Sequence, residues 1–488
     1  MKSIAMTVLL LLTTTQLMAA PKSGPLNAFE LGKRQFENGN FTRALDLFAT
    51  AIDQAHDSSS RSKAFYYQGM VLFELGYYFS SYVSFRNVLL GADERNRDVY
   101  EKAIKNAVTI TDRLGMVDRS GKILEKLPDG YIPTAVADSA HYAIGVYLLF
   151  NGEEDRAAGR LKSVHPHSAY YTKALFHLGV IATKKKDYKE AVFYFQKVTD
   201  LTRGKSGTES ISELARLNLA RSVYSSGDME QAVELYSRFT SSSPYWLTIL
   251  LEAGWPLMRV ADTTVSLGNL HTVLSPFYRE DLVGEAYLLR ATILFSLCRY
   301  EEMRRTLSTF FALYDPVVRA MQTESSQLGS SEAYYRAFST EKGLHRAFLN
   351  TVKRDPGVVK LVKTQRLLRD ERRQISRFGR NEQMRRIAAV LDEAEKTISS
   401  EIGSTLQRLH KRKLAELLDQ REQANYLKVE IVTGEKELIE SQKGLPPRRI
   451  VDVETTVAAG YDFWAYNGEY WEDELGAYVY TTESACVH

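Results

Sequence analysis

The sequence predicts an all-helical protein that is built mainly from repeated helix pairs. Small residues return with a period in the thirties along the first two-thirds of the chain, and other residue types follow each of them at fixed offsets. The last third carries long runs of helical periodicity. A period of this length is typical of solenoids of stacked helix pairs, and a chain with 44% hydrophobic residues can build a large core.

Each repeat places a small residue first, a turn residue eighth, alanine or serine thirteenth and a large apolar residue seventeenth. The clearest copies are Gly32, Gly39, Ala44 and Phe48; Gly69, Gly76, Ser81 and Phe85; Gly145, Gly152, Ala157 and Leu161; and Gly179, Lys186, Ala191 and Phe195. Further copies start at Val108, Ala220, Pro256 and Ala291. About six copies are well formed and two are irregular. A small first residue lets two helices cross closely, and glycine tolerates the positive φ of a helix end.

This frame resembles the tetratricopeptide repeat (TPR), for example where Asn38-Gly39-Asn40-Phe41 stands between two helical stretches. The resemblance implies a curved solenoid over residues 27–315 that binds other proteins. In such arrays the first helix of each pair lines a concave groove, which accepts a peptide or helix. One turn after the first position, the resemblance gives the groove residues Phe36, Phe73, Leu149, Thr183 and Tyr224. We expect some of these side chains to remain exposed.

The N-terminus has the pattern of a secretory signal peptide over residues 1–19. Lys2 precedes an apolar run from Ile4 to Leu12, and small residues follow up to Ala20. The run is shorter than the roughly 20 residues of a membrane-spanning helix, although a retained anchor is the alternative. The sequence therefore predicts export to a bacterial periplasm, and it leaves association with the outer membrane open.

Residues 331–445 are expected to form a unit of long helices. One apolar residue recurs every three or four positions along Ile387, Leu391, Ala394, Ile398, Ile402, Leu406 and Leu409, and less strictly along Leu414, Leu417, Ala424 and Ile431. Such a narrow seam suits an antiparallel hairpin or a coiled coil. The seam packs either on the last repeat or on another chain, and the sequence does not decide whether these helices self-associate.

The segment from Lys353 to Arg386 is basic, with twelve Lys or Arg residues and four acids. Its candidate patch is Arg366, Arg369, Arg372, Arg373, Arg377 and Arg380. Two interpretations remain open: a solvated helix face, or a docking site for an acidic partner, a cell-wall polymer or anionic lipid head groups. Few aromatic residues interleave with the cations and the formal net charge is only +3, which argues against nucleic acid.

Residues 446–488 form an acidic tail that is rich in aromatic residues. Trp464, Tyr470 and Trp471 are its candidate binding residues, and Asn467-Gly468 is a turn signal for a small hairpin. Because Trp and Tyr rarely stay in water, the tail either folds back onto the helical unit, with its acids near the basic segment, or binds a partner. A module that binds cell-wall glycan through these rings is the alternative to a scaffold.

Several motifs in residues 240–488 resemble exported TPR proteins of the adventurous gliding-motility envelope complex. They are Glu252-Ala253-Gly254-Trp255, Leu267-Gly268-Asn269-Leu270 with Ser275-Pro276-Phe277, Leu297-Cys298-Arg299-Tyr300, and the stretch from Asp462-Phe463-Trp464 through Asn467 to Gly476. This resemblance implies a structural subunit of an envelope-spanning complex near the outer membrane.

The two cysteines, Cys298 and Cys486, are the only candidates for a disulfide. An oxidising compartment favours a bridge between them, which would close a long loop and fix the tail on the last repeat. The alternative is that Cys298 is a buried free thiol.

No catalytic signature is present in the sequence. Gly204-Lys205-Ser206 lacks the first glycine of a phosphate loop, and His165 and His167 have no third metal ligand at a useful spacing. We therefore expect a scaffold without enzyme activity, metal or cofactor.

Overall fold

The computed structural model describes residues 27–91, 97–127, 130–278, 281–378, 381–440, 457–458, 460, 462, 468–480 and 484–486. In these residues the chain forms twenty α-helices and a few short 3₁₀ helices, without a β-strand. The all-helical prediction is therefore confirmed for the described part of the chain. The predicted signal peptide, residues 1–19, lies outside it. None of the described helices is long and apolar enough to cross a lipid bilayer.

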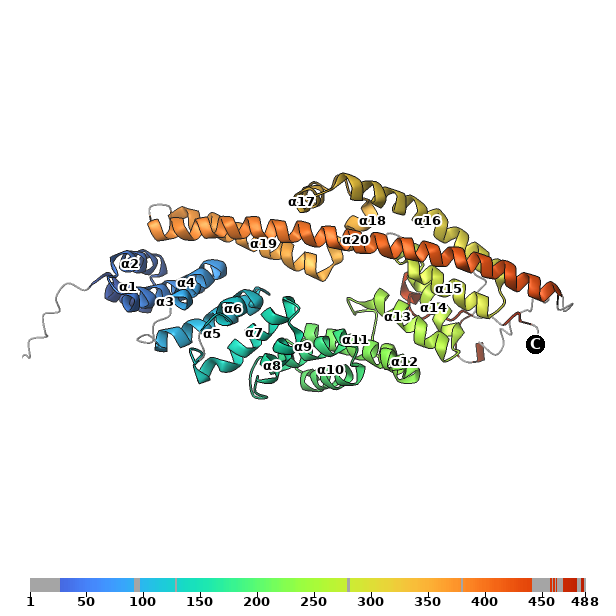
Figure 1. The fold of residues 1–488 in the computed structure, drawn as a ribbon, viewed down its shortest axis with the longest axis horizontal. Coiled ribbons are helices and arrows are strands. Elements are labelled where there is room, and N and C mark those ends of the chain that lie inside the picture. The colour runs from blue at the N-terminus through green and yellow to red at the C-terminus, as the bar shows by residue number, and fades with distance from the viewer. Residues whose placement is uncertain are drawn as a thin grey trace, which may run out of the picture.

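The first sixteen helices make eight consecutive pairs that curve into an arc (Figure 1). The pairs are α1 (Ala28–Glu37) with α2 (Phe41–Gln54), α3 (Ser58–Glu74) with α4 (Tyr78–Leu90), α5 (Arg97–Arg113) with α6 (Val117–Leu124), α7 (Ala137–Phe150) with α8 (Glu154–Lys162), α9 (Tyr171–Lys184) with α10 (Tyr188–Thr202), α11 (Glu209–Ser226) with α12 (Met229–Ser237), α13 (Trp246–Arg259) with α14 (Thr263–Val273), and α15 (Gly284–Ser296) with α16 (Tyr300–Gln327). Each repeat found in the sequence falls on one pair, including the two irregular copies.

The first and seventeenth positions of a repeat meet where its two helices cross. A Cβ atom on Gly32 would lie 2.9 Å from the Phe48 ring, and one on Gly179 would lie 2.7 Å from the Phe195 ring. Gly69 is placed in the same way against Phe85. All three glycines are buried, so the missing side chain makes room for a phenylalanine.

The eighth position of every repeat has a left-handed backbone. Five of these residues are glycines that stand at the predicted turns: Gly39, Gly76, Gly115, Gly152 and Gly227. The other three are Lys186, Ala261 and Cys298, with φ of 61°, 63° and 54°. One rule of backbone geometry therefore holds along the whole arc, even where the residue is not glycine.

The seventh repeat starts two residues earlier than the sequence analysis placed it. Its first position is Gly254 rather than Pro256, because a Cβ on Gly254 would touch Leu289 and Leu270, and Ala261 then takes the left-handed eighth position. The serine at the thirteenth position, Ser266, donates a hydrogen bond to the Gly254 carbonyl oxygen at 2.9 Å. Pro256 lies inside α13 and is buried.

Four further helices follow the arc: α17 (Ser331–Thr340), α18 (Arg346–Arg354), α19 (Pro356–Ile375) and α20 (Glu382–Glu440). The predicted end of the array at residue 315 does not coincide with a helix end, because α16 runs through Pro316 to Gln327. Helix α20 has 59 residues, which corresponds to a length of roughly 90 Å.

The apolar seam of α20 is used within the chain. Its residues Ile387, Leu391, Ile398, Ile402, Leu406, Leu417, Ala424 and Ile431 are buried, and Ala394, Leu409 and Leu414 are half-buried. Helices α15, α16, α17 and α19 pack along it, and α19 and α20 form an antiparallel hairpin. The seam is therefore covered by this chain's own helices.

Helix α20 runs from the first repeats to the last and connects the two ends of the arc (Figure 1). Near its start, Asn381 donates to Asp46 Oδ1 at 3.2 Å, and Gln383 bonds to Asp53 on α2. Near its end, Arg304 of α16 pairs with Glu435 at 2.6 Å. Helix α20 therefore closes the solenoid, and we call this helix the strap.

Candidate partner-binding site

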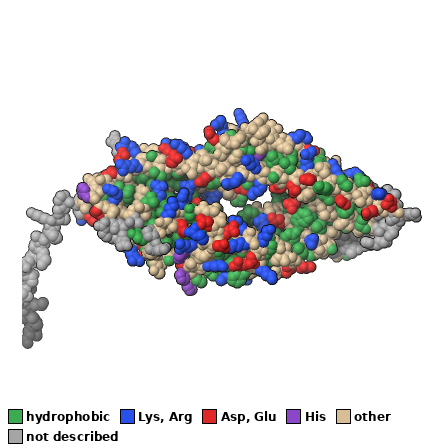
Figure 2. Space-filling view, in the orientation of Figure 1, with side chains coloured by type: hydrophobic (Ala, Val, Ile, Leu, Met, Phe, Trp, Pro, Cys, Tyr) green, Lys and Arg blue, Asp and Glu red, His purple; other side chains and the backbone are tan. Residues whose placement is uncertain are grey.

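The arc and the strap face each other across a hollow. The space-filling view shows an opening between them, with both basic and acidic side chains around it (Figure 2). Helix α19 lies on the side of α20 that faces the arc (Figure 1). The Lys360 side chain extends from α19 to the turn between α5 and α6, where a Cβ on Gly115 would be 2.0 Å from its Cε atom. The inner surface of the hollow therefore includes both the repeats and α19.

The five predicted groove residues differ in exposure. Thr183 is exposed, whereas Phe36, Phe73, Leu149 and Tyr224 are half-buried. The aromatic ones pack within the array: Phe36 lies against Phe41 and Tyr67, and Phe73 lies against Tyr78. Whether these positions contact a partner stays a prediction.

A polar cluster on α5, α7 and α9 was not singled out in the sequence. Tyr142 Oη donates to Asp112 Oδ1 at 3.3 Å, and Lys173 pairs with the same carboxylate. The Tyr142 ring stacks on Tyr170 with centroids 5.0 Å apart. Asp112 lies one turn after the first position of the third repeat, so the rule that named the groove residues would have found it if applied there.

His177 of α9 lies beside this cluster. Burial lowers the pKa of His177 to about 4; the nearby Asp112 carboxylate opposes this shift, and the ammonium groups of Lys360 and Lys173 add to it. His177 is therefore neutral at pH 7. The cluster thus combines a neutral imidazole with a carboxylate that is already paired.

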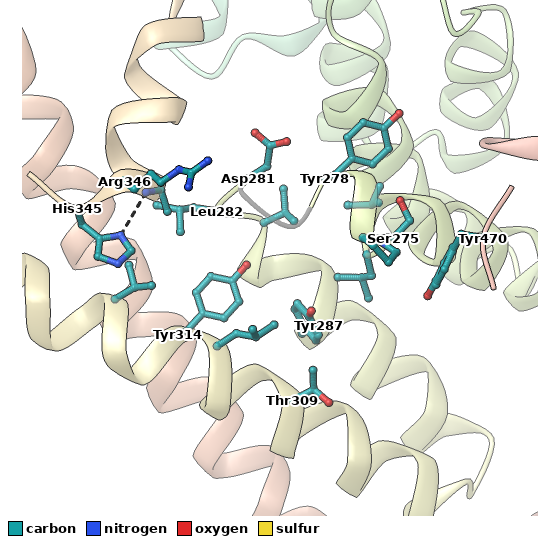
Figure 3. A pocket seen from close by; sticks show the side chains of 17 residues that line it. Ser275, Tyr278, Asp281, Leu282, Tyr287, Thr309, Tyr314, His345, Arg346 and Tyr470 are labelled. Atoms are coloured by element: carbon teal, nitrogen blue, oxygen red, sulfur yellow. Dashed lines mark hydrogen bonds between the residues drawn. The ribbon is translucent and has the colours of Figure 1, made fainter. Parts of the chain in front are cut away.

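Two cavities lie where the last repeats meet the C-terminal helices. One, of about 580 Å³, is bordered by the start of α13, by α18 and by the Leu409–Glu416 part of α20. The other, of about 530 Å³, lies between the end of α14, α16 and α18 (Figure 3). Its walls are mostly apolar, with Tyr278, Tyr287, Tyr314 and Tyr470 among them.

Polar groups at the edge of the second cavity already have partners within the chain. Asp281 at its edge pairs with Arg354 at 2.7 Å. His345 Nδ1 accepts a hydrogen bond from the Ala347 backbone N–H at 3.3 Å (Figure 3). In the described part of the chain, no group of His, Cys, Asp and Glu side chains has the arrangement of a metal site.

The basic patch divides into paired and unpaired cations. Arg369 pairs with Glu395 at 2.5 Å and donates to Tyr335 Oη at 3.0 Å. Arg372 pairs with Asp392 and Arg373 pairs with Asp370. Among the described residues, Arg366 and Arg377 are exposed and make no ion pair. Arg380 lies outside the described residues.

The described part of the tail packs on α14 and α15, not on the basic unit as one interpretation had it. Gly476 N–H donates to Thr272 Oγ1 at 2.8 Å, and Tyr480 N–H donates to the Thr264 carbonyl at 3.2 Å. A Cβ on Gly268 would lie 1.8 Å from the Tyr478 carbonyl oxygen. Helix α14 is buried almost all round for this reason.

Of the three candidate tail residues, Tyr470 stacks on His271 at 4.5 Å, and Trp471 is 45% exposed. Trp464 and the predicted turn residue Asn467 lie outside the described residues. Residues 468–480 contain a 3₁₀ helix (Glu472–Glu474) and no strand, so this stretch is not one arm of a hairpin. One exposed ring is a small platform for a glycan.

The tail is fixed by a disulfide between Cys298 and Cys486, whose Cα atoms are 5.1 Å apart. Ala485 N–H donates to the Leu297 carbonyl at 2.8 Å beside it. Cys298 occupies the left-handed eighth position of the last repeat. The turn between α15 and α16 is thus the attachment point of the tail.

Comparison with family models assigns the repeat type. Residues 29–78 and residues 172–204 each match a model described as tetratricopeptide repeat. The chain therefore carries TPR repeats, which are typical of proteins that bind other proteins. A comparison with curated proteins found no match.

Several solved structures have similar helical arrays. The C-terminal part of a TPR repeat-containing protein from Cytophaga hutchinsonii is 16% identical, covers 50% of this chain and 95% of its own, and has a TM-score of 0.34. A tetratricopeptide repeat protein from Parabacteroides merdae is 12% identical, covers 59% of this chain and 91% of its own, and has a TM-score of 0.30. A Rap protein complexed with competence and sporulation factor is 12% identical, covers 80% of this chain and 98% of its own, and has a TM-score of 0.31. These likenesses are too distant to indicate a function.

Proposed function

We propose that this protein is an exported scaffold that holds a segment of a partner protein in the hollow between the arc and the strap. The closure of the TPR arc by α20 carries the proposal, because TPR arrays bind their partners on the concave face. In this chain that face is one wall of the hollow, which we call the channel. The exposed Thr183 and the opening in Figure 2 support a channel that is not filled by the chain itself.

Export is supported by two independent features. The residues from Lys2 to Ala20 have the signal-peptide pattern. The Cys298–Cys486 bond suits an oxidising compartment, since disulfides persist there and are rare in the cytosol. A bacterial periplasm, with or without association to the outer membrane, meets both requirements.

A narrower proposal is a subunit of a gliding-motility envelope complex. The motifs that carry this resemblance come together in one packing unit. Trp255 Nε1 donates to Glu285 Oε1 at 2.8 Å, Gly268 lies under Tyr478, and Leu297 accepts a bond from Ala485. These residues hold the tail on the last repeats. They therefore support an architecture shared with the proteins of that complex, and they do not identify the partner.

Site-specific photo-crosslinking in the native envelope tests the scaffold function. A photoreactive side chain at Thr183, on the first helix of its repeat, should cross-link to a defined segment of one partner. The same group at the exposed Phe193, on the second helix of that repeat, serves as the control. Equal labelling from both positions, or none from Thr183, would count against the channel.

A further inference from the structure

Helix α19 presents an amphipathic face that its own chain leaves uncovered. Val359, Val362 and Leu367 are 46%, 37% and 44% exposed. On an ideal helix these three side chains fall within the same half of the surface as Lys363 and Arg366, which are also exposed. The opposite half packs on α20 through buried residues such as Leu368 and Ile375. An aliphatic and cationic stripe thus borders the hollow.

The cations of this stripe lack acidic partners within the described chain. No described ion pair involves Lys363 or Arg366, and the one acid on this face, Asp370, pairs with Arg373. The acids on the facing repeats are compensated as well: Asp112 pairs with Lys173, and Glu252 pairs with Arg221 at 2.7 Å. The stripe therefore carries unpaired positive charge, although the whole chain is only +3. Clefts lined by one sign of charge attract the opposite sign strongly.

We infer that the segment held in the channel is an acidic amphipathic stretch of the partner protein, with its apolar side chains on Val359, Val362 and Leu367 and its carboxylates on Lys363 and Arg366. The inference rests on the proposed scaffold function and names the chemistry of its partner. The apolar residues supply desolvated contact area, and the cations give orientation and a fast, salt-dependent association.

The position of the stripe favours a polypeptide over a flat surface. Lys360, on the same helix, reaches the α5–α6 turn beside Gly115, so the repeats stand next to this face. A single helix is about 10–12 Å wide with its side chains, whereas a membrane surface is flat and extended. Anionic lipid is therefore the alternative that the experiment must separate.

The test measures binding of a defined probe by the mature, oxidised protein. The probe is a fluorescein-labelled peptide of leucine and glutamate, with leucines at helical spacing on one face; a peptide of the same composition in scrambled order is the comparison. We expect the patterned peptide to bind more tightly and to lose affinity with added salt. The double variant Lys363→Glu/Arg366→Glu should weaken this binding about tenfold or more, because it places like charges against the glutamates.

The matched control is Arg408→Glu/Lys411→Glu. It changes one Arg and one Lys at the same spacing on α20, both exposed and outside any described ion pair, and it should stay within about twofold of the wild type. Val362→Ser should weaken the patterned peptide and leave the scrambled one unchanged. Equal loss in both double variants, or equal binding of both peptides, would overturn the inference. So would binding of phosphatidylglycerol vesicles that the peptide cannot displace.

Photo-crosslinking separates this inference from the function on which it rests. If Thr183 cross-links to a partner segment that is neutral or basic, and Lys363→Glu/Arg366→Glu does not reduce the yield, the scaffold function stands and the acidic partner is wrong. If the segment is acidic and apolar and the double variant abolishes its capture, both are supported. If no position in the hollow cross-links, the scaffold function itself fails.

Discussion

At the scale of single residues, the crossing positions show how one repeat tolerates different side chains. Three repeats pair a glycine with a phenylalanine, as in Gly179 and Phe195, whereas the last repeat pairs Ala291 with Leu307. The side chains at these two positions, sixteen residues apart, together fill the space where the two helices cross. Overfilled crossings cost stability because close-packed side chains cannot move aside.

Gly179→Ala should destabilise the protein by about 1–3 kcal/mol, since the new methyl group would lie 2.7 Å from the Phe195 ring. Phe195→Leu alone leaves a void and also destabilises. The double variant reproduces the Ala–Leu pair of the last repeat, so its cost in urea unfolding should be smaller than the sum of the two. Gly159→Ala, on an open face of α8, is the control and should be neutral or stabilising. If the destabilisation of the double variant equals the sum of the two single variants, the two side chains do not share the space at the crossing.

A second residue-scale prediction concerns the left-handed eighth positions. A side chain there costs about 1–2 kcal/mol in backbone energy, so Ala261→Gly and Lys186→Gly should each stabilise the protein by about 0.5–1 kcal/mol after the entropy of the unfolded glycine is subtracted. The reverse change, Gly39→Ala, should destabilise it, although a Cβ at Gly39 meets no atom within 4 Å. Thermal unfolding of the three variants measures the effect. A destabilised Ala261→Gly variant would show that the turn is not strained.

At the scale of elements, a glutamate on α19 supplies the N-terminal cap of a helix nearly three hundred residues away. Helix α4 has no capping side chain of its own. Glu371 accepts hydrogen bonds from the backbone N–H groups of Phe79 and Ser80, at 3.0 and 2.5 Å. Burial raises the pKa of Glu371, and the hydrogen bonds from Ser80 and Phe79 oppose that shift. The carboxylate fixes the strap hairpin to the second repeat.

Glu371→Gln should loosen this end of the strap, because a neutral amide is a weaker acceptor for the two N–H groups and fits the positive end of α4 less well. The expected loss is about 1–2 kcal/mol of unfolding free energy. Amide exchange at Phe79 and Ser80 should accelerate while exchange in α9 stays unchanged. Asp370→Asn, which changes the exposed carboxylate immediately before Glu371 in α19, should have no such effect.

The contact between the tail and α14 should depend on pH. Burial lowers the pKa of His271 to about 4, with Arg290 adding to the shift; the rings of Tyr470, Tyr478 and Tyr480 face it. The pKa of an unfolded histidine is about 6.5. The stabilisation is therefore fully present above pH 6.5 and is lost as the pH falls towards 4, by at most about 3 kcal/mol.

Amide exchange at Gly476 and Tyr480, whose N–H groups bond to α14, measures this effect. Protection should fall between pH 7 and pH 5, after correction for the intrinsic rate. His271→Gln should abolish this dependence, and His167→Gln, at an exposed site, should preserve it. If protection in the wild type does not change with pH, His271 does not control the contact between the tail and α14.

The elements also show where sequence reasoning succeeds and where it stops. Periodicity located all eight pairs, because the crossing and turn positions are local requirements of each pair. It misplaced the seventh repeat, since Pro256 in α13 looked like a small first residue and Ala261 does not look like a turn glycine. Glu371 carries no local signal: a glutamate in a basic helix looks solvated until its partner helix is known.

At the scale of the whole molecule, the same limit applies to the strap. The seam from Ile387 to Ile431 predicts a helix with one covered stripe, but the stripe does not say which helices cover it. The sequence therefore left a hairpin and an intermolecular coiled coil open. The bond between Cys298 and Cys486 was proposed from compartment and count alone. That bond placed the tail on the last repeat, whereas charge favoured the basic segment; the close approach at Gly268 and the stacking on His271 hold the tail on the last repeats.

Removal of the disulfide is the prediction at this scale. The two cysteines are 188 residues apart in sequence, and a loop of this size corresponds to a stabilisation of about 3–5 kcal/mol in the chain-entropy model. Reduction, or the variant Cys298→Ser/Cys486→Ser, should lower the urea midpoint and first release the segment around Ala485. A non-reducing peptide map of the mature protein must show the bridge; two freely alkylated thiols would refute it.

The strap has a consequence for how this fold can change over time. An open solenoid gains or loses repeats freely, because each unit contacts only its neighbours. Here α20 contacts both the earliest and the latest pairs, so an inserted pair would push the two ends apart, and a rigid helix of fixed length could no longer reach both. Duplication of a repeat would have to be matched by several added turns of α20, in a register that preserves its seam. The number of repeats and the length of α20 must therefore change together during evolution.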